Sequence, residues 1–215
     1  MDRKRCFRGA FYLAGMMILA LGLTLNTQTG LGVSPINSVP FCASKILSIS
    51  YGNASFIVYC LFIALQLLLR DRRAYPSILL QLPLSLLFTR MLDLCVALLP
   101  VSLDALWQNT LLLIIALILS GIGAAMMLVT RLIPTPGDGI VQTIADRLGI
   151  ETGLAKNGFD VLSVAVTFAP GAVSGNFLYG IGLGTLLAMV LVGRVIALFN
   201  RLFKARIQRL CGLNA

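Results

Sequence analysis

Two proline turns, 101 residues apart, hold the polar groups best placed to bind a solute. The first spans residues 34–39 and the second spans residues 135–140. Serine and threonine are favoured N-caps and proline suits the first helical position, so each turn predicts the start of a helix. The exposed amides and positive dipole end of such a helix attract anions and polar solutes. The candidate solute-binding residues are Ser34, Pro35, Asn37, Thr135, Pro136, Gly137, Asp138 and Gly139.

The two helices that these turns begin are short. Segments 36–48 and 137–148 reach only ~20 Å, against ~30 Å of hydrocarbon. One interpretation has them capped at the membrane surface, with Asn37 and Asp138 reaching back to the amide of the cap residue. The other has them dip inward, so that both N-termini point at the midplane from opposite sides. The glycines beside Asp138 permit close backbone approach and favour the inward arrangement slightly.

Four charged residues fall inside apolar segments, namely Arg90, Asp93, Asp160 and Arg194. A lone charge in hydrocarbon costs at least ~2.5–3.5 kcal/mol on insertion scales, so we expect partners. Arg90 lies three residues before Asp93, and Lys156 lies four before Asp160, so local pairs and snorkelling are one interpretation. The alternative pairs Asp160 with Arg194, and Arg90 with Asp93, as inner and outer gates or ion-coupling groups.

The chain lacks the groups that most enzymes and metal sites use. It contains no histidine, and its five cysteines are scattered without a C-x-x-C pair. This excludes imidazole catalysis and argues against a thiolate metal site or a disulfide framework. Because no nucleophile–base pair and no ATP-binding signature occur, we expect no enzymatic activity and no cofactor.

Composition assigns the chain to the membrane. Apolar residues make up 58% of the 215 residues and charged residues 12%, and the mean hydropathy is +0.93. A soluble domain of this size cannot bury so much apolar surface. The predicted fold is all-α, a single polytopic domain over residues 1–215 with the lipid bilayer as its partner, and Pro83 marks an expected kink. The predicted spans are approximately 9–28, 53–70, 76–98, 107–130, 155–170 and 177–200.

The basic residues fix the predicted orientation. The net charge is +9, but the Lys and Arg residues sit in blocks between apolar segments and not in one stripe, which disfavours nucleic-acid binding. If the N-terminus is cytoplasmic and the chain crosses six times, fourteen of the 17 Lys and Arg residues lie on the cytoplasmic side and only Lys45 lies on the outer side. The other two, Arg90 and Arg194, lie within spans. Both termini are therefore predicted to be cytoplasmic. Residues 201–215 form a basic amphipathic tail, expected on the anionic leaflet.

The two proline turns belong to an internal duplication. Repeat 1 covers about 9–100 and repeat 2 about 105–200, and each holds three spans and one half-helix after its first span. Because three is odd, the second repeat enters from the opposite side. This predicts inverted repeats, related by a pseudo-two-fold axis in the membrane plane. The pairs that recur after 101 residues are Gly22 and Gly123, Pro35 and Pro136, Ile49 and Ile150, and Gly52 and Gly153.

Small and polar residues within the spans predict helix packing. Glycines let helices approach closely in lipid, and packing is the favoured role for those found here. Gln66 and Gln81 are placed to hydrogen-bond between helices. The glycines within predicted spans are Gly15, Gly22, Gly121, Gly123, Gly180, Gly182, Gly184 and Gly193.

Three stretches carry a resemblance to a known family. They are the turn at 32–35, the turn at 136–139 and the glycine-spaced last span from Gly180 to Gly193. On these the chain resembles the bacterial YczE/YyaS/YitT-type integral membrane proteins over roughly residues 9–200. Ile36-Asn37 stands where that family has an aromatic residue and an aspartate. The resemblance implies a six-span protein of the bacterial cell (inner) membrane and no defined activity.

The leading functional hypothesis is a small-solute transporter or channel-like protein, with a site for a small solute or ion between the two half-helices. Two alternatives stay open. One is a non-transporting scaffold or regulator of a partner protein, acting through the basic tail and the loop at 70–75. The other is the substrate-capture subunit of a vitamin importer, which would require an external ATPase module.

Overall fold

The chain folds into helices throughout the residues described by the computed structural model, which are 3–101, 103–173 and 180–213. No strand occurs within those ranges, so the all-α prediction is confirmed there. The helices are α1 (Arg3–Gln28), α2 (Pro35–Ile46), α3 (Tyr51–Leu69), η1 (Arg72–Ala74), α4 (Tyr75–Leu79), α5 (Gln81–Leu98), α6 (Leu106–Val129), α7 (Pro136–Leu148), α8 (Thr152–Val173) and α9 (Leu183–Leu210).

Within the described residues, five segments are long and apolar enough to cross a membrane, which confirms the multi-pass class. They are α1, α3, the stretch Arg72–Leu98, α6 and α9. The predicted sixth span, 177–200, corresponds to α9, and its residues 177–179 lie outside the described residues. The predicted fifth span corresponds to α8, which is 22 residues long but is not among the five; its first turns hold Lys156 and Asp160. The six-span count therefore stays a prediction.

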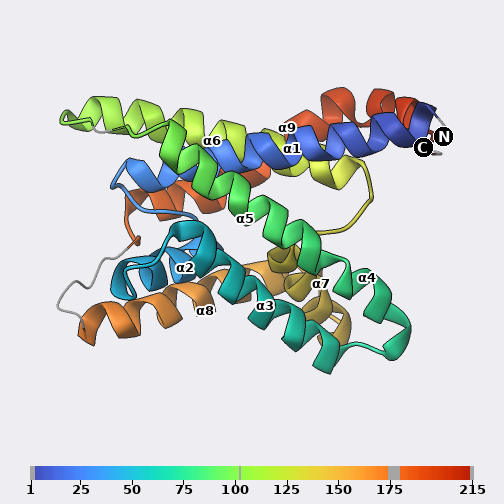
Figure 1. Ribbon diagram of the computed structural model, residues 1–215, viewed down its shortest axis with the longest axis horizontal. Helices are drawn as coiled ribbons and strands as arrows, with labels where there is room; N and C mark the ends of the chain where they lie inside the picture. The colour runs from blue at the N-terminus through green and yellow to red at the C-terminus, as the bar shows by residue number, and fades with distance from the viewer. Residues whose placement is uncertain (1–2, 102, 174–179, 214–215) are drawn as a thin grey trace.

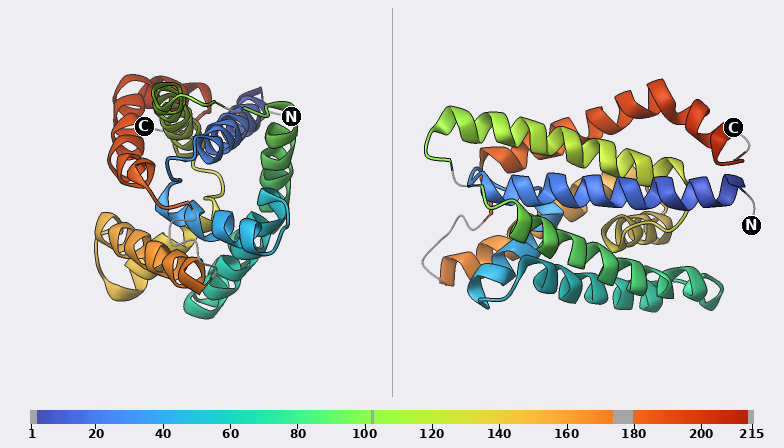
Figure 2. Two further views of the ribbon diagram at one scale, coloured as in Figure 1. Left: turned by 90° about the vertical axis from the view of Figure 1, so that its left-hand side faces the viewer. Right: turned by 45° about the horizontal axis from the view of Figure 1, so that its top comes forward.

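The helices form two layers joined by α5 (Figure 1). Helices α1, α6 and α9 pack in one layer, while α2, α3, α7 and α8 form the other. Helix α5 packs against α1 on one side and α3 on the other. The largest apolar core lies between these three, around Met16, Phe62 and Phe88. In the right-hand view of Figure 2 the long helices run roughly parallel, as a bundle that crosses a bilayer requires.

The two half-helices begin at the repeated prolines, as predicted. Ser34 precedes α2 with extended backbone angles (φ −60°, ψ 146°), and Thr135 precedes α7 in nearly the same conformation (φ −60°, ψ 152°). Helix α7 ends at Gly149, whose φ of 66° lies in the left-handed region that glycine adopts without steric cost. With 12 and 13 residues, each helix reaches about 18–20 Å, too short to cross the hydrocarbon core.

The third predicted span is interrupted near Pro83. Helix α4 ends at Leu79 and α5 begins at Gln81. Proline has no N–H, so Pro83 cannot donate a helical hydrogen bond to the carbonyl of Leu79, four residues earlier. The predicted kink is thus confirmed as a break between two helices.

Glycines bring the backbones of α1 and α6 into contact. A Cβ atom added at Gly22 would lie 2.5 Å from Oγ of Ser120, and one added at Gly123 would lie 2.4 Å from the backbone nitrogen of Leu19. Leu19 and Ser120 are themselves 101 residues apart, so each contact is the counterpart of the other. The packing role predicted for the span glycines is confirmed at these positions.

The basic tail continues the last helix, because α9 does not end until Leu210. Ile207 and Cys211 are buried against Val129 at the end of α6, with Phe11 of α1 beside them. Burial raises the pKa of the Cys211 thiol, and the positive charge of Arg8 opposes that rise. Part of the tail therefore packs on the chain's own first helix, and its contact with the lipid leaflet stays a prediction.

Candidate functional site

The starts of α2 and α7 meet inside the molecule. A Cβ atom added at Gly137 of α7 would stand only 2.8 Å from Cδ1 of Ile36 on α2. These two residues are equivalent positions of the 101-residue repeat. Pro35, Pro136 and Gly137 are all buried. The contact favours the arrangement in which both half-helices dip inward, because two helices on opposite membrane surfaces cannot touch.

Each turn carries a matched polar pair. On α2, Nδ2 of Asn37 donates to Oγ of Ser34 over 2.7 Å. On α7, Oγ1 of Thr135 donates to Oδ2 of Asp138 over 2.8 Å and accepts from the Asp138 amide over 3.2 Å. The prediction that both side chains reach back to the cap amide is wrong. The cap hydroxyl, which both donates and accepts, is the partner in each turn.

Polar side chains of the long helices hold both starts in place. Gln66 and Gln81 exchange two hydrogen bonds of 3.0 Å, and Nε2 of Gln66 also donates to the carbonyl of Pro136 over 3.3 Å. The hydroxyl of Ser38 in α2 lies 2.7 Å from the hydroxyl of Thr167 in α8. Gln66 of α3 and Thr167 of α8 are repeat equivalents, so each half-helix is anchored by a long helix of the other repeat. The interhelical hydrogen bonds predicted for Gln66 and Gln81 are confirmed.

A cavity of about 180 Å³ lies where the two turns meet, and we call it the central cavity. It brings most of the predicted site residues together. Pro136 and Gly139 do not line it; both are buried, and Gly139 packs beneath the side chains of Gln66 and Gln81. The predicted residues in its lining are Ser34, Pro35, Asn37, Thr135, Gly137, Asp138 and Asp160.

Asn26 and Ser120 also line the central cavity, and sequence reasoning missed both. Asn26 is only 1% exposed, and neither its amide nitrogen nor its oxygen has a hydrogen-bond partner among the described residues. The buried hydroxyl of Ser120 lacks one as well. Leaving such a group unpaired costs about 1–3 kcal/mol, so these atoms are available to a bound solute or water. The available signal was a polar residue within an apolar run, near the end of the run for Asn26 and in its interior for Ser120.

Asp160 supplies a buried charge to the central cavity. Its side chain is 5% exposed, and its Oδ2 lies 3.4 Å from Nζ of Lys156, which also lines the cavity. Asp138 lines the same cavity. Asp160 and Arg194 both belong to the described residues, and they form no ion pair with each other. Arg194 is exposed on α9. The predicted local pair of Lys156 with Asp160 is confirmed, while the pair of Asp160 with Arg194 is not formed, because Lys156 is one turn away on the same helix.

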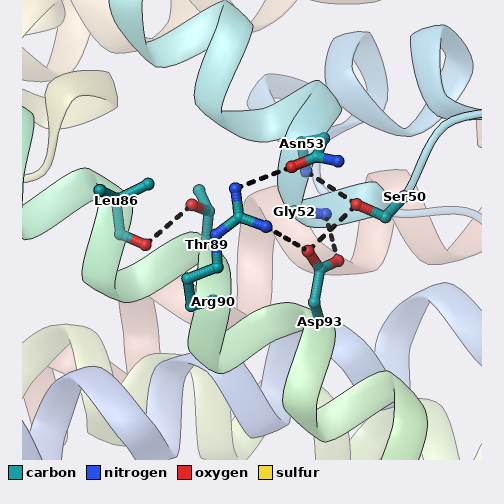
Figure 3. Close-up of polar contacts among 7 residues, drawn as sticks. All are labelled: Ser50, Gly52, Asn53, Leu86, Thr89, Arg90 and Asp93. Carbon is teal, nitrogen blue, oxygen red and sulfur yellow. Dashed lines mark hydrogen bonds and ion pairs between the residues drawn. The ribbon is translucent and has the colours of Figure 1, made fainter.

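Arg90 and Asp93 lie outside the cavity, at the seam between α3 and α5 (Figure 3). Asp93 accepts from the amide of Gly52 over 2.8 Å and from Oγ of Ser50 over 3.0 Å. Arg90 pairs with Asp93 at 3.5 Å and donates to Oδ1 of Asn53 over 2.8 Å. The carboxylate therefore caps the first turn of α3, where the helix dipole favours a negative charge. We call these five residues the α3–α5 latch.

The counterpart seam, between α8 and α9, is open. Within the described residues α8 and α9 do not pack as α3 and α5 do. A Cβ atom added at Gly52 would lie 2.3 Å from the carbonyl of Thr89, whereas one at Gly153 would meet nothing within 4 Å. Arg194 stands 101 residues after Asp93, so no carboxylate is available there to cap α8. Residues of both α8 and α9 line the central cavity, which thus reaches between them.

A second cavity, of about 380 Å³, adjoins the central one. Thr135 and Asp138 line both, and the second cavity adds Arg131 and Gln142. Because Arg131 belongs to the connection from α6 to α7, this space leads from the central cavity toward that loop. Asp138 thus stands between two chambers.

The comparisons with known proteins agree with the membrane assignment. The chain is 26% identical over 199 residues to the uncharacterized membrane protein YczE of Bacillus subtilis, covering 91% of this chain and 86% of that one. It is 28% identical over 192 residues to the uncharacterized protein YyaS of the same organism, covering 88% of this chain and 90% of that one. No solved structure matches. The profile of DUF6198, a family of unknown function, matches residues 6–201, and the chain belongs to that family.

Proposed function

We propose that this chain is a small-solute transporter or channel-like protein, and that the central cavity is its binding site. One observation carries the proposal. The starts of two half-helices meet at a cavity whose lining includes the buried, unpaired amide of Asn26. Non-helical backbone and unpaired polar groups at membrane depth are tolerated where they line a cavity that holds water or a solute.

The repeat contacts support an inverted duplication. Ile36 meets Gly137, its own equivalent, and the Gly22–Ser120 contact is the counterpart of the Gly123–Leu19 contact. Self-contact at equivalent positions, with reciprocal contacts on either side, is the signature of two-fold symmetry. With three spans in each repeat the axis lies in the membrane plane, as in many transporters that bind solutes at the repeat interface.

The arrangement of the chain ends supports a cytoplasmic location for both termini. In Figure 1 the N- and C-termini, the turn from α3 to α4 and the loop from α6 to α7 lie at one end of the molecule. These segments carry most of the basic residues, whereas the connection from α5 to α6 lies at the opposite end. Basic residues mark the cytoplasmic side, so the bacterial cell membrane would hold the protein with this end inward.

Cysteine labelling tests the site. In a variant lacking the five native cysteines, Ser34→Cys and Thr135→Cys are introduced singly and labelled in membranes with small impermeant thiol reagents from each side. We expect labelling at least about tenfold slower than at a surface thiol, because access to the central cavity limits the reaction. A solute that occupies the cavity should slow it further.

The matched control is Ser77→Cys, since Ser77 is exposed on α4 near the basic end of the molecule. It should react rapidly from the cytoplasmic side and be unaffected by solutes. Equally rapid labelling of Ser34→Cys from outside and of Thr135→Cys from inside would mean two surface helices, and the proposed site would be lost.

A further inference from the structure

We propose that the central cavity selects a small solute that carries a protonated amine. The inference rests on the proposed function and names its substrate class. It starts from the charges of the lining, which includes two carboxylates, Asp138 and Asp160, and one ammonium, that of Lys156. The repeats share a backbone arrangement but not a charge: Asn37 is neutral where Asp138 is acidic.

Lys156 already occupies the position that a solute amine would take. Its Nζ lies 3.4 Å from Oδ2 of Asp160, longer than the ~2.7–2.9 Å of a strong charge-assisted hydrogen bond. The lysine side chain is 53% exposed while that of Asp160 is 5% exposed. The aspartate is therefore fixed and buried, and the lysine can turn away. A solute ammonium that displaces it would restore the charge balance of Asp160 with a closer contact.

The positive end of α7 does not reverse this preference. A helix N-terminus contributes roughly half a positive charge, and Asp138 in the first turn of α7 already compensates it with a full negative one. Helix α2 has no acidic residue in its first turn, and the amides of Asn37 and Ser38 already donate to the carbonyl of Ser34. The unpaired side chains of Asn26 and Ser120 offer further hydrogen bonds.

Aromatic side chains complete the cavity for an organic cation. Tyr59 and Phe88 both line it, and their rings are stacked with centroids 6.3 Å apart. Apolar side chains of α1, α6 and α9 form most of the remaining wall. Ring faces attract cations, and the apolar wall accommodates a short hydrocarbon chain. The site thus fits an ammonium group attached to a small apolar body.

Three probes of equal chain length test the charge preference: n-butylamine, n-butanol and butyrate at neutral pH, where the amine is protonated. Each is titrated against the full chain in lipid nanodiscs by calorimetry, and each is tried as a protectant of Ser34→Cys. We expect butylamine alone to bind and protect. Asp160→Asn and Asp138→Asn should each weaken its binding by about tenfold or more, whereas Asp104→Asn, an exposed carboxylate outside the cavity, should not.

Lys156→Gln supplies the discriminating variant, because it removes the competing ammonium. It should tighten butylamine binding severalfold, an outcome that a purely structural lysine would not produce. If butyrate or butanol binds and protects instead, or if Lys156→Gln weakens amine binding, the amine class is overturned while the site stands. If none of the three binds or protects, the amine class is overturned; if Ser34→Cys also labels at the surface rate, the proposed function falls with it.

Discussion

Replacing Gly123 with leucine should prevent α1 and α6 from packing. A Cβ atom there would already lie 2.4 Å from the backbone nitrogen of Leu19 and 2.7 Å from the carbonyl oxygen of Gly15. Backbone atoms cannot rotate away, so the two helices must separate along their length. We expect a loss of about 3 kcal/mol or more and little monodisperse protein after solubilisation. Thermal unfolding and size-exclusion chromatography in detergent measure both effects.

Gly9→Leu is the matched control, because Gly9 lies on α1, the helix that Gly123 contacts, with nothing within 4 Å of an added Cβ atom. It should behave like the wild type. Gly22→Leu should be as damaging as Gly123→Leu, since the two glycines make counterpart contacts. A Gly123→Leu protein as stable as Gly9→Leu would contradict the α1–α6 interface on which the repeat arrangement depends.

Replacing Asp93 with alanine should open the seam between α3 and α5. The carboxylate accepts hydrogen bonds from Gly52 and Ser50 at the start of α3, and bonds to a charged acceptor contribute about 1.5–3 kcal/mol each. We therefore expect a loss of about 2–3 kcal/mol, with Asp93→Asn less affected because an amide oxygen still accepts. Cys95, buried on α5, should become reactive toward a small permeant thiol reagent.

Asp104→Ala, which removes an exposed carboxylate from the connection between α5 and α6, controls for the lost charge. Unchanged stability and continued protection of Cys95 in Asp93→Ala would show that the α3–α5 latch does not hold the seam. If the seam opens, the capping carboxylate explains why α3 and α5 pack together while α8 and α9 do not. One seam is closed by a capping carboxylate, and the other, with Arg194 at the equivalent position, has none.

The duplicated turns were predictable because local chemistry determines them. Serine or threonine before proline begins a helix wherever it occurs, so the starts at Pro35 and Pro136 agree with the sequence. Pairs such as Lys156–Asp160 follow from helical spacing alone. The close contact at Gly22 and Gly123 likewise follows from the need for small residues between helices in lipid.

The central cavity was harder to predict because it depends on which helices meet. Asn26 and Ser120 are 94 residues apart, and neither belongs to a motif. Their meeting in one lining requires that α1 and α6 pack closely, which only the three-dimensional structure shows. The pairing of Asp160 with Arg194 failed for a related reason. Counting residues along each predicted span placed the two side chains at a similar depth in the membrane. It gave no information on which face of α9 carries the arginine.

One cross-linking measurement tests most directly whether the starts of α2 and α7 meet. Ile36→Cys and Gly137→Cys are combined on a cysteine-free background with a protease site between α5 and α6; the first change removes the side chain that would crowd the second. A short bifunctional thiol reagent is applied in membranes, followed by the protease. We expect the two halves to stay joined, whereas Ser77→Cys combined with Gly137→Cys should release them. Halves that separate in both variants would contradict a shared central cavity.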